Sequence, residues 1–187
     1  MVTNGMGYLA RDGRNANAAV VVSVDGSDFG QNPAVAVAFQ RRLEQAAFRA
    51  GGGAYRAPAE TVGSFLEGRG RLELDRVQPT YPRGVTPCDL GSLLPGELAD
   101  TLRAGLRAYE RKIAGYTAPE AILTGLETRT SSPVRLKRGE DFVCTQLAGL
   151  YPCGEGAGYA GGIMTAAVDG VRCAAALMKE NAPSQGA

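Results

Sequence analysis

The chain has 187 residues, enough to bury the core of one domain or part of a larger one, and its charges nearly balance at +1. Histidine is absent, which excludes Ser-His-Asp and Cys-His catalysis, zinc sites that need imidazole and any imidazole base. Any acid–base chemistry must therefore use carboxylates, Tyr, Lys, Cys, water or a cofactor. The 26 glycines, about twice the usual share, indicate sharp turns or close backbone approach.

The charge pattern, the cysteines and the first residues indicate the partners and the cellular location to expect. Basic residues are spread along the chain, so nucleic acid is not an expected partner. The four cysteines show no C-x-x-C spacing and are expected to be reduced thiols, with no metal site. The segment after Met1 does not resemble a signal peptide, and no apolar run approaches the roughly 18 residues of a membrane span. We therefore expect a cytoplasmic protein without membrane contact.

The first half of the chain predicts one strand, one helix and a long irregular region. Residues 1–17 are a polar loop, and the β-branched residues 18–25 predict a strand. Apolar residues at helical spacing predict a helix over 34–50, which three glycines end. Residues 54–95 show little periodicity, and we expect irregular loop with one short strand at most.

The second half alternates between helical and strand patterns. The clearest amphipathic helix is predicted over 96–115. Strands are predicted over 121–127, 133–137 and 148–153, and a last helix over 162–178. The expected fold class is α/β, or α+β when the chain is taken alone.

The last predicted helix carries apolar and small residues on one face. They are Met164, Ala167, Val168, Val171, Ala174, Ala175 and Met178. Asp169 and Arg172 lie off this face, and we expect both to be exposed to solvent.

A glycine-rich turn is expected between the last strand and the last helix. Five of the nine residues from Gly154 to Gly162 are glycine. Such a turn lets backbone N–H groups approach an anion, and the following helix directs its unpaired N–H groups and positive dipole end to the same place. Glu155 could accept hydrogen bonds from sugar-like hydroxyls. The alternative is a tight strand-to-helix turn whose glycines serve close packing.

Residues 156–161 match G-x-G-x-x-G literally, but the context of a dinucleotide fingerprint fails. That fingerprint opens a βαβ unit of about 30 residues with an acidic residue roughly 20 positions on. Here only nine polar residues follow the helix, which leaves no room for a second strand. The match is therefore no evidence of a complete dinucleotide-binding unit.

Four stretches, in order along the chain, resemble a family of FAD-dependent dehydrogenases. They are VTNGMGYLARDGRNANAAVVVSV (2–24), PTYPRGVTPCDL (79–90), GLETRTSSPVR (125–135) and GLYPCGEGAGYAGGIMTAAVDGVRCA (149–174). The resemblance covers residues 2 to about 176 and implies the C-terminal portion of a glutathione-reductase-like flavoprotein. The N-terminal Rossmann half, which would hold the FAD pyrophosphate, is not in this sequence.

The resemblance also implies a division of the chain and a cofactor site. Residues 1–147 would be an inserted substrate-side domain, 148–178 the strand, turn and helix of the FAD-binding domain, and 179–187 a flexible tail. Glu155 would bond a ribityl hydroxyl, where relatives usually carry Asp, and the start of the last helix would face the pyrimidine end of the isoalloxazine. The implied FAD-binding residues are Gly154, Glu155, Gly156, Gly158, Gly161, Gly162 and Ile163.

Two polar segments are candidates for the substrate side of such an enzyme. Arg129 could bind a substrate carboxylate or contact the flavin edge, and is the one catalytic candidate, with hydroxyls from Thr130 and Ser131. The alternative is a polar turn held by its own Ser and Thr side chains. The second segment contributes Asn4, Tyr8, Arg11, Asn15 and Asn17, which could equally be turn residues.

The sequence thus predicts an FAD-dependent oxidoreductase portion that transfers hydride between flavin and a small organic substrate. In that case the cofactor supplies the redox chemistry and no histidine is needed. The competing hypothesis is a non-catalytic α/β module that binds an anionic ligand or a partner chain through the turn at 154–162.

Overall fold

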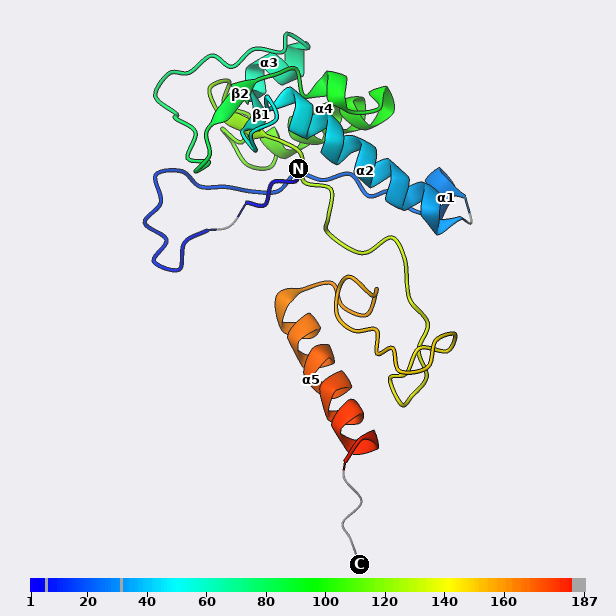
Figure 1. Ribbon diagram of the computed structural model, residues 1–187. Helices are drawn as coiled ribbons and strands as arrows, with labels where there is room; N and C mark the ends of the chain where they lie inside the picture. Colours follow the sequence, from blue (N-terminus) through cyan, green and yellow to red (C-terminus); the bar gives the residue numbers. More distant parts are fainter. Residues whose placement is uncertain (6, 31, 183–187) are drawn as a thin grey trace, which may run out of the picture. The chain divides into compact units, whose positions relative to one another are not determined.

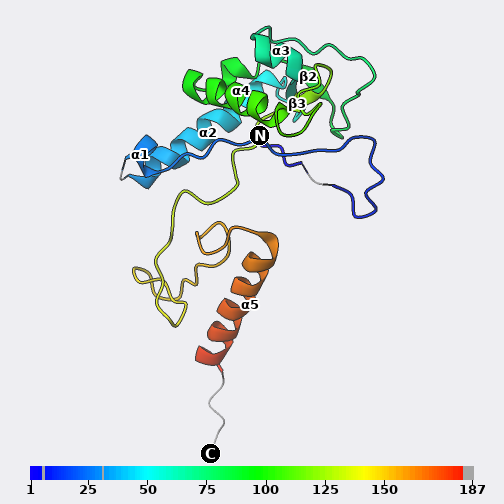
Figure 2. The same ribbon diagram turned by 180° about the vertical axis from the view of Figure 1, so that it is seen from behind.

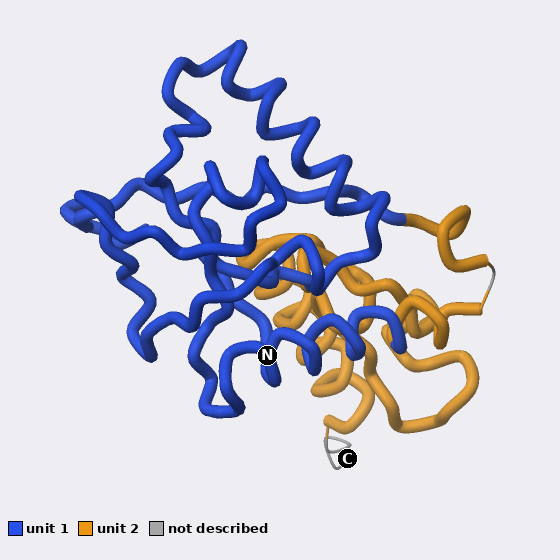
Figure 3. The backbone as a smooth tube through the Cα atoms, turned by 90° about the horizontal axis from the view of Figure 1, so that it is seen from above, with its two compact units in different colours: residues 1–24, 38–128 blue, residues 25–37, 129–187 orange. Residues whose placement is uncertain are grey.

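The computed structural model describes residues 1–5, 7–30 and 32–182 (Figures 1 and 2). It contains helices and one small mixed sheet, which confirms the α/β class. The chain divides into two compact units (Figure 3). Unit 1 comprises residues 1–24 and 38–128, and unit 2 comprises residues 25–37 and 129–187.

The sheet lies in unit 1 and has the strand order β2-β1-β3. The central strand β1 (Ala57–Thr61) pairs in parallel with β2 (Val85–Pro87) and antiparallel with β3 (Ile122–Thr124). Every residue of β1 is buried. Pro58 has no N–H to donate, but its carbonyl accepts from the backbone N–H of Gly125 at 3.0 Å. The central strand is therefore enclosed along its whole length.

Two apolar clusters hold unit 1 together. Ala57, Ala59 and Val85 form the first, on the sheet itself. The second joins Phe65 of helix α3 (Val62–Glu67), Leu90 beside the 3-10 turn η1 (Gly91–Leu93) and Leu106 of helix α4 (Gly96–Glu110). Figures 1 and 2 both show α3 and α4 beside the sheet. The core of unit 1 thus lies between these two helices and the sheet.

Helix α2 (Pro33–Ala50) confirms the helix predicted over 34–50. It ends at Ala50, and Gly51 follows, where a Cβ atom would lie 1.9 Å from the carbonyl oxygen of Arg56. Only glycine allows the chain to return so closely toward β1. A short helix α1 (Gly26–Phe29), capped by the Asp25 side chain, was not predicted.

Several strand predictions were wrong. Residues 18–25, 133–137 and 148–153 form no strand in the part of the chain that the structure describes. A β-branched or apolar run forms a strand only where a neighbour supplies the other half of its hydrogen-bond ladder. Among the described residues, 133–137 and 148–153 make only single backbone hydrogen bonds, such as Leu136 N–H to the Ala157 carbonyl and Cys144 N–H to the Leu150 carbonyl. Conversely, the region 54–95, expected to be mainly irregular, contains β1, α3, β2 and η1. The strand predicted over 121–127 is present as the shorter β3.

Unit 2 contains one long helix, α5 (Ile163–Glu180), which confirms the helix predicted over 162–178. An irregular segment leads from residue 129 to the glycine-rich turn before α5. Of the tail predicted over 179–187, residues 179 and 180 belong to α5, and residues 183–187 lie outside the described part.

Candidate functional site

The glycine-rich turn is built from its own backbone hydrogen bonds and rests on residues 132–136. Gly154 and Gly158 both have positive φ, 72° and 83°. Gly158 N–H donates to the backbone carbonyl of Glu155 at 2.9 Å, and Tyr159 N–H donates to that of Gly154 at 3.0 Å. The side-chain hydroxyl of Ser132 donates to the Gly156 carbonyl at 3.1 Å. These hydrogen bonds therefore set the shape of the turn.

The glycines of the turn serve two different purposes. A Cβ on Gly158 would lie 2.5 Å from the Val134 carbonyl oxygen, so this glycine is required for packing. A Cβ on Gly161 would have only the Ser131 hydroxyl nearby, at 4.0 Å, and one on Gly156 would meet nothing within 4 Å. The packing explanation of the glycines thus holds for Gly158 and leaves Gly156 and Gly161 unexplained.

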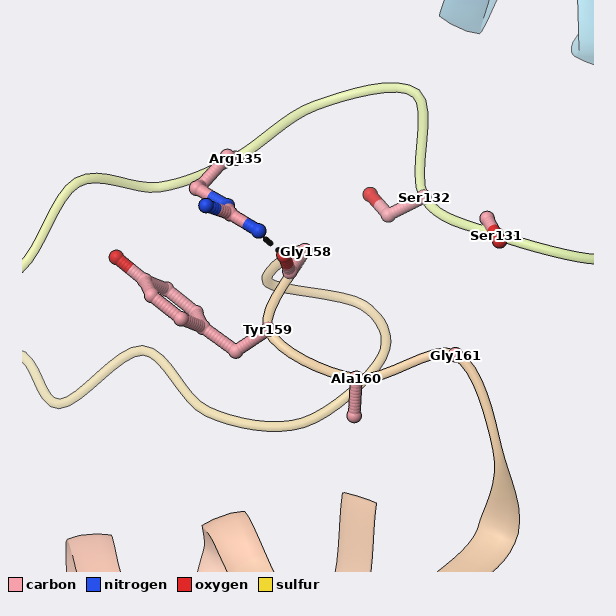
Figure 4. Close-up of a pocket in the computed structure, with 7 residues that line it drawn as sticks. All are labelled: Ser131, Ser132, Arg135, Gly158, Tyr159, Ala160 and Gly161. Carbon is pink, nitrogen blue, oxygen red and sulfur yellow. Dashed lines mark hydrogen bonds between the residues drawn. The ribbon is translucent and has the colours of Figure 1, made fainter. Parts of the chain in front are cut away.

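A shallow cavity of about 330 Å³ opens beside the turn. Figure 4 shows Ser131 and Ser132 on one segment facing Ala160 and Gly161 on the other, with Arg135 above the Tyr159 ring. The guanidinium of Arg135 donates to the Gly158 carbonyl at 2.9 Å and lies 5.1 Å from the centre of that ring. The cavity therefore offers hydroxyls, a cation and open backbone on one surface.

The first turn of α5 lies directly beyond Gly161. Its N-cap residue, Gly162, supplies no side chain to accept from the first N–H groups of the helix. The first backbone hydrogen bond of the helix joins Ala166 N–H to the Gly162 carbonyl, at 2.9 Å. The preceding N–H groups and the positive end of the helix dipole can therefore act on an electron-rich group near Gly161 and Gly162.

A largely buried ion pair fixes the turn to α5. Arg138 donates two hydrogen bonds to Asp169, at 2.6 and 3.0 Å, and a third to the Pro152 carbonyl at 2.6 Å. Asp169 also accepts the N–H of Gly154 at 2.8 Å. The Arg138 guanidinium lies 3.7 Å from the centre of the Tyr159 ring. One pair thus joins α5, both ends of the turn and the segment before it.

The side chains of Arg138 and Asp169 are 10% and 13% exposed, so the expectation of an exposed Asp169 was wrong. Hydrogen bonds from Arg138 and from the Gly154 N–H hold the pKa of Asp169 below its ordinary value. The same pairing raises the pKa of Arg138, which stays charged. The helical pattern gave no signal of the burial of Asp169, because a carboxylate on the side opposite the apolar residues ordinarily faces solvent.

The chain is similar to known proteins. A family model described as "FAD-dependent protein, C-terminal domain-like" matches residues 1–130. The chain belongs to this family. A protein of Clostridium beijerinckii (strain ATCC 51743 / NCIMB 8052), described as "Uncharacterized protein", is 46% identical over 181 residues, which cover 96% of this chain and 34% of that protein. The chain thus spans about a third of the length of this relative.

The glycine-rich turn lies outside residues 1–130, which the FAD-dependent family model matches. The size and lining of its cavity indicate which part of FAD could bind there. The cavity is at the small end of ligand sites, so it accommodates one part of the cofactor rather than the whole. The open backbone at Gly161, the Ser131 hydroxyl and the first turn of α5 are suited to an electron-rich ring edge. The donor set therefore fits an edge of the isoalloxazine.

The structure brings only some of the predicted cofactor residues to this cavity. Gly158 and Gly161 line it, while Gly162 and Ile163 begin α5 beside it. The N–H of Gly154 donates a hydrogen bond to the Asp169 carboxylate, and Gly156 lies exposed on the turn. Glu155 is half-buried and does not line the cavity.

The predicted substrate-side residues divide between the two units. Ser131 lines the cavity, and Arg129 and Thr130, both exposed, precede it in unit 2. The other candidates, all in unit 1, are Asn4, Tyr8, Arg11, Asn15 and Asn17. The Asn15 side chain donates to the Gln78 carbonyl at 2.8 Å, which attaches the first loop to the loop before β2. Ser132, Arg135 and Arg138 were not predicted as site residues from the sequence, because none of them belongs to a recognisable catalytic or binding motif.

Two further observations concern the described residues alone. Within residues 1–5, 7–30 and 32–182, no group of three or more Cys, Asp or Glu side chains could hold a metal ion. No helix in this part of the chain is long and apolar enough to span a membrane.

Proposed function

We propose that the chain is the C-terminal portion of an FAD-dependent oxidoreductase, a dehydrogenase of the glutathione-reductase-like class. Family membership supports the link to FAD, and the length of the Clostridium relative supports a larger protein. The single observation that carries the proposal is the cavity at Gly161, where open backbone, the Ser131 hydroxyl and the uncapped start of α5 converge.

In this proposal the two regions of the chain have different roles. Residues 1–147 form a substrate-side domain, and residues 148–178 complete an FAD-binding domain. An N-terminal Rossmann half, supplied outside this sequence, holds the adenine, ribose and pyrophosphate. FAD, when bound, supplies hydride transfer with a small organic substrate.

The residues of the turn hold and orient one end of the cofactor. The backbone at Gly161 and Gly162, with the first turn of α5, stabilises negative charge at the pyrimidine edge of the ring. Glu155 accepts a hydrogen bond from a ribityl hydroxyl after its side chain turns toward the cofactor. Arg129 contacts a substrate carboxylate or the flavin edge, with Thr130 and Ser131 as hydroxyl donors. The Arg138–Asp169 pair positions the turn and contacts no cofactor.

The test is to produce this chain together with the part of the Clostridium relative that lies outside the 181 matched residues. We expect the purified protein to be yellow and to release FAD on denaturation. A colourless protein that takes up no added FAD would contradict the proposal. Binding of simple anions without FAD would instead favour the non-catalytic α/β module, whose support is the same uncapped helix start.

A further inference from the structure

Helix α5 has two different faces. The face turned to its own unit contains Ala166, Asp169, Gly170, Cys173 and Ala176, the least exposed residues of the helix. Their spacing of three, one, three and three places them on one side. Cys173 is buried and its thiol donates to the Tyr151 carbonyl at 3.7 Å. This side of α5 is therefore already packed.

The opposite side is apolar and exposed. We call Met164, Val168, Val171, Ala175 and Met178 the outer stripe of α5. Their spacing alternates between four and three residues, which keeps them on one face along the whole helix. Met164 is 75% exposed, Val171 70% and Met178 66%. These side chains belong to the apolar face that the sequence pattern indicates, and among the described residues of unit 2 they remain exposed.

The edges of the outer stripe are consistent with a docked surface. Ala167 and Ala174 flank it on one side, and such short side chains let another backbone approach closely. Arg172 and Lys179 flank the other side, where charged ends can remain in water. A continuous apolar strip with a polar rim is typical of a protein interface.

We propose that the outer stripe of α5 docks onto an α/β polypeptide equivalent to the part of the longer relative outside the matched residues. This rests on the proposed function and names its partner surface. The Clostridium relative contains 181 residues matched to this chain, α5 among the 96% covered, within a protein about three times as long. A chain of that size has ample surface to cover the stripe.

The segment before the turn is already hydrogen-bonded within unit 2. The carbonyls of Leu150, Tyr151 and Pro152 accept from the Cys144 N–H, the Cys173 thiol and the Arg138 guanidinium. The partner surface is therefore inferred from the outer stripe alone, because an apolar helix face is buried against another helix or the face of a sheet.

The experiment uses the chain and the remaining segment of the Clostridium relative as two separately tagged polypeptides. Size-exclusion chromatography with light scattering measures their complex, and we expect one copy of each. Val168→Lys with Val171→Lys should weaken the complex about a hundredfold or more, because it buries two charges in an apolar contact. The matched control is Leu147→Lys, at a residue of unit 2 that is 61% exposed and outside the stripe. We expect no loss from this control.

Each other outcome has a defined meaning. The proposal would be overturned if no complex forms. It would also be overturned if the double variant with Val168→Lys and Val171→Lys binds as tightly as the wild type. A homodimer that the stripe substitutions dissolve would identify a second copy as the occupant and also overturn it. So would a loss of thermal stability of the isolated double variant, because the chain itself would then cover the stripe. A complex that forms through the stripe but holds no FAD would leave this proposal intact and refute the proposed function.

Discussion

Strand β1 and helix α5 differ in how they relate to their surroundings. Residues 57–61 are all buried, although they read APAET and show no apolar alternation. Helix α5 has a regular apolar pattern, and the residues of that pattern are exposed. Unit 1 is therefore held by an apolar core, whereas the turn and α5 in unit 2 are held mainly by a largely buried ion pair and backbone hydrogen bonds.

The difference shows that an apolar pattern does not by itself tell whether those side chains are covered within the same unit. Hydrophobic periodicity requires some surface to cover it, but it does not say whether that surface lies in the same unit. The polar side of α5, which would ordinarily face solvent, is the side packed against its own unit through Asp169.

The largest expected effect is a difference in stability between substitutions of a buried apolar residue and of an exposed one. Phe65 is 3% exposed in the core of unit 1, so Phe65→Ala should cost about 3–4 kcal/mol. Val171→Ala, on the outer stripe, should cost about 0.5 kcal/mol or less in the isolated chain. Urea denaturation of both variants measures the free energy of unfolding. Equal losses would contradict the contrast between a covered core and an uncovered stripe.

The second prediction tests whether the ion pair replaces an apolar core in unit 2. Arg138→Met leaves Asp169 largely buried without its cation and should cost about 2–3 kcal/mol. The matched control is Arg69→Met, which removes a pair that is 42% and 61% exposed and should cost about 0.5 kcal/mol or less. Loss of helical circular dichroism on denaturation measures both. If the two substitutions have the same effect, the pair does not hold the turn.

The contrast between β1 and α5 also explains which elements could be predicted from the sequence. Helices α2, α4 and α5 were predicted because each carries a helical apolar period over at least 15 residues. Strand β1 was missed because a proline and two alanines in a five-residue strand give no periodic signal. The Arg138–Asp169 pair joins residues 31 apart, and neither belongs to a motif, so only the fold reveals it.

The third prediction distinguishes the packing glycine from the open one. Gly158→Ala forces a Cβ to within 2.5 Å of the Val134 carbonyl at a positive φ, and should cost about 1–2 kcal/mol. Gly161→Ala meets no close atom and should leave stability unchanged within about 0.5 kcal/mol. Thermal denaturation compares them. A large loss at Gly161 would mean that this glycine serves the turn rather than a ligand.

The smallest expected effect is a difference in pH dependence between the units. Burial raises the pKa of Glu60, whose Oε1 accepts the Leu90 N–H at 2.7 Å while Oε2 has no hydrogen-bond partner among the described residues. The folded state then holds its proton more tightly, so stability falls as pH rises above the ordinary value of 4.5 and levels off beyond the raised pKa. Glu60→Gln should remove this fall and add up to about 1 kcal/mol at neutral pH.

Asp169 should act in the opposite direction. Its lowered pKa makes the unfolded state bind the proton more tightly, so its contribution is complete above the ordinary value of 3.8 and is lost as pH falls through the folded pKa. Asp169→Asn should remove this acid dependence. Denaturation between acid and neutral pH checks both residues, and a fall in the same direction for both would contradict the assignment.

The central claim is that Gly161 is glycine because a flavin lies against it. The most direct measurement is the visible absorbance of bound flavin in the chain purified together with the remaining segment of the relative. We expect the wild type to retain FAD, and Gly161→Val to lose it while keeping its helix content. Gly170→Ala, at another position where a Cβ meets nothing within 4 Å, should keep the cofactor. Equal flavin content in the wild type and Gly161→Val, with both proteins folded, would contradict the claim.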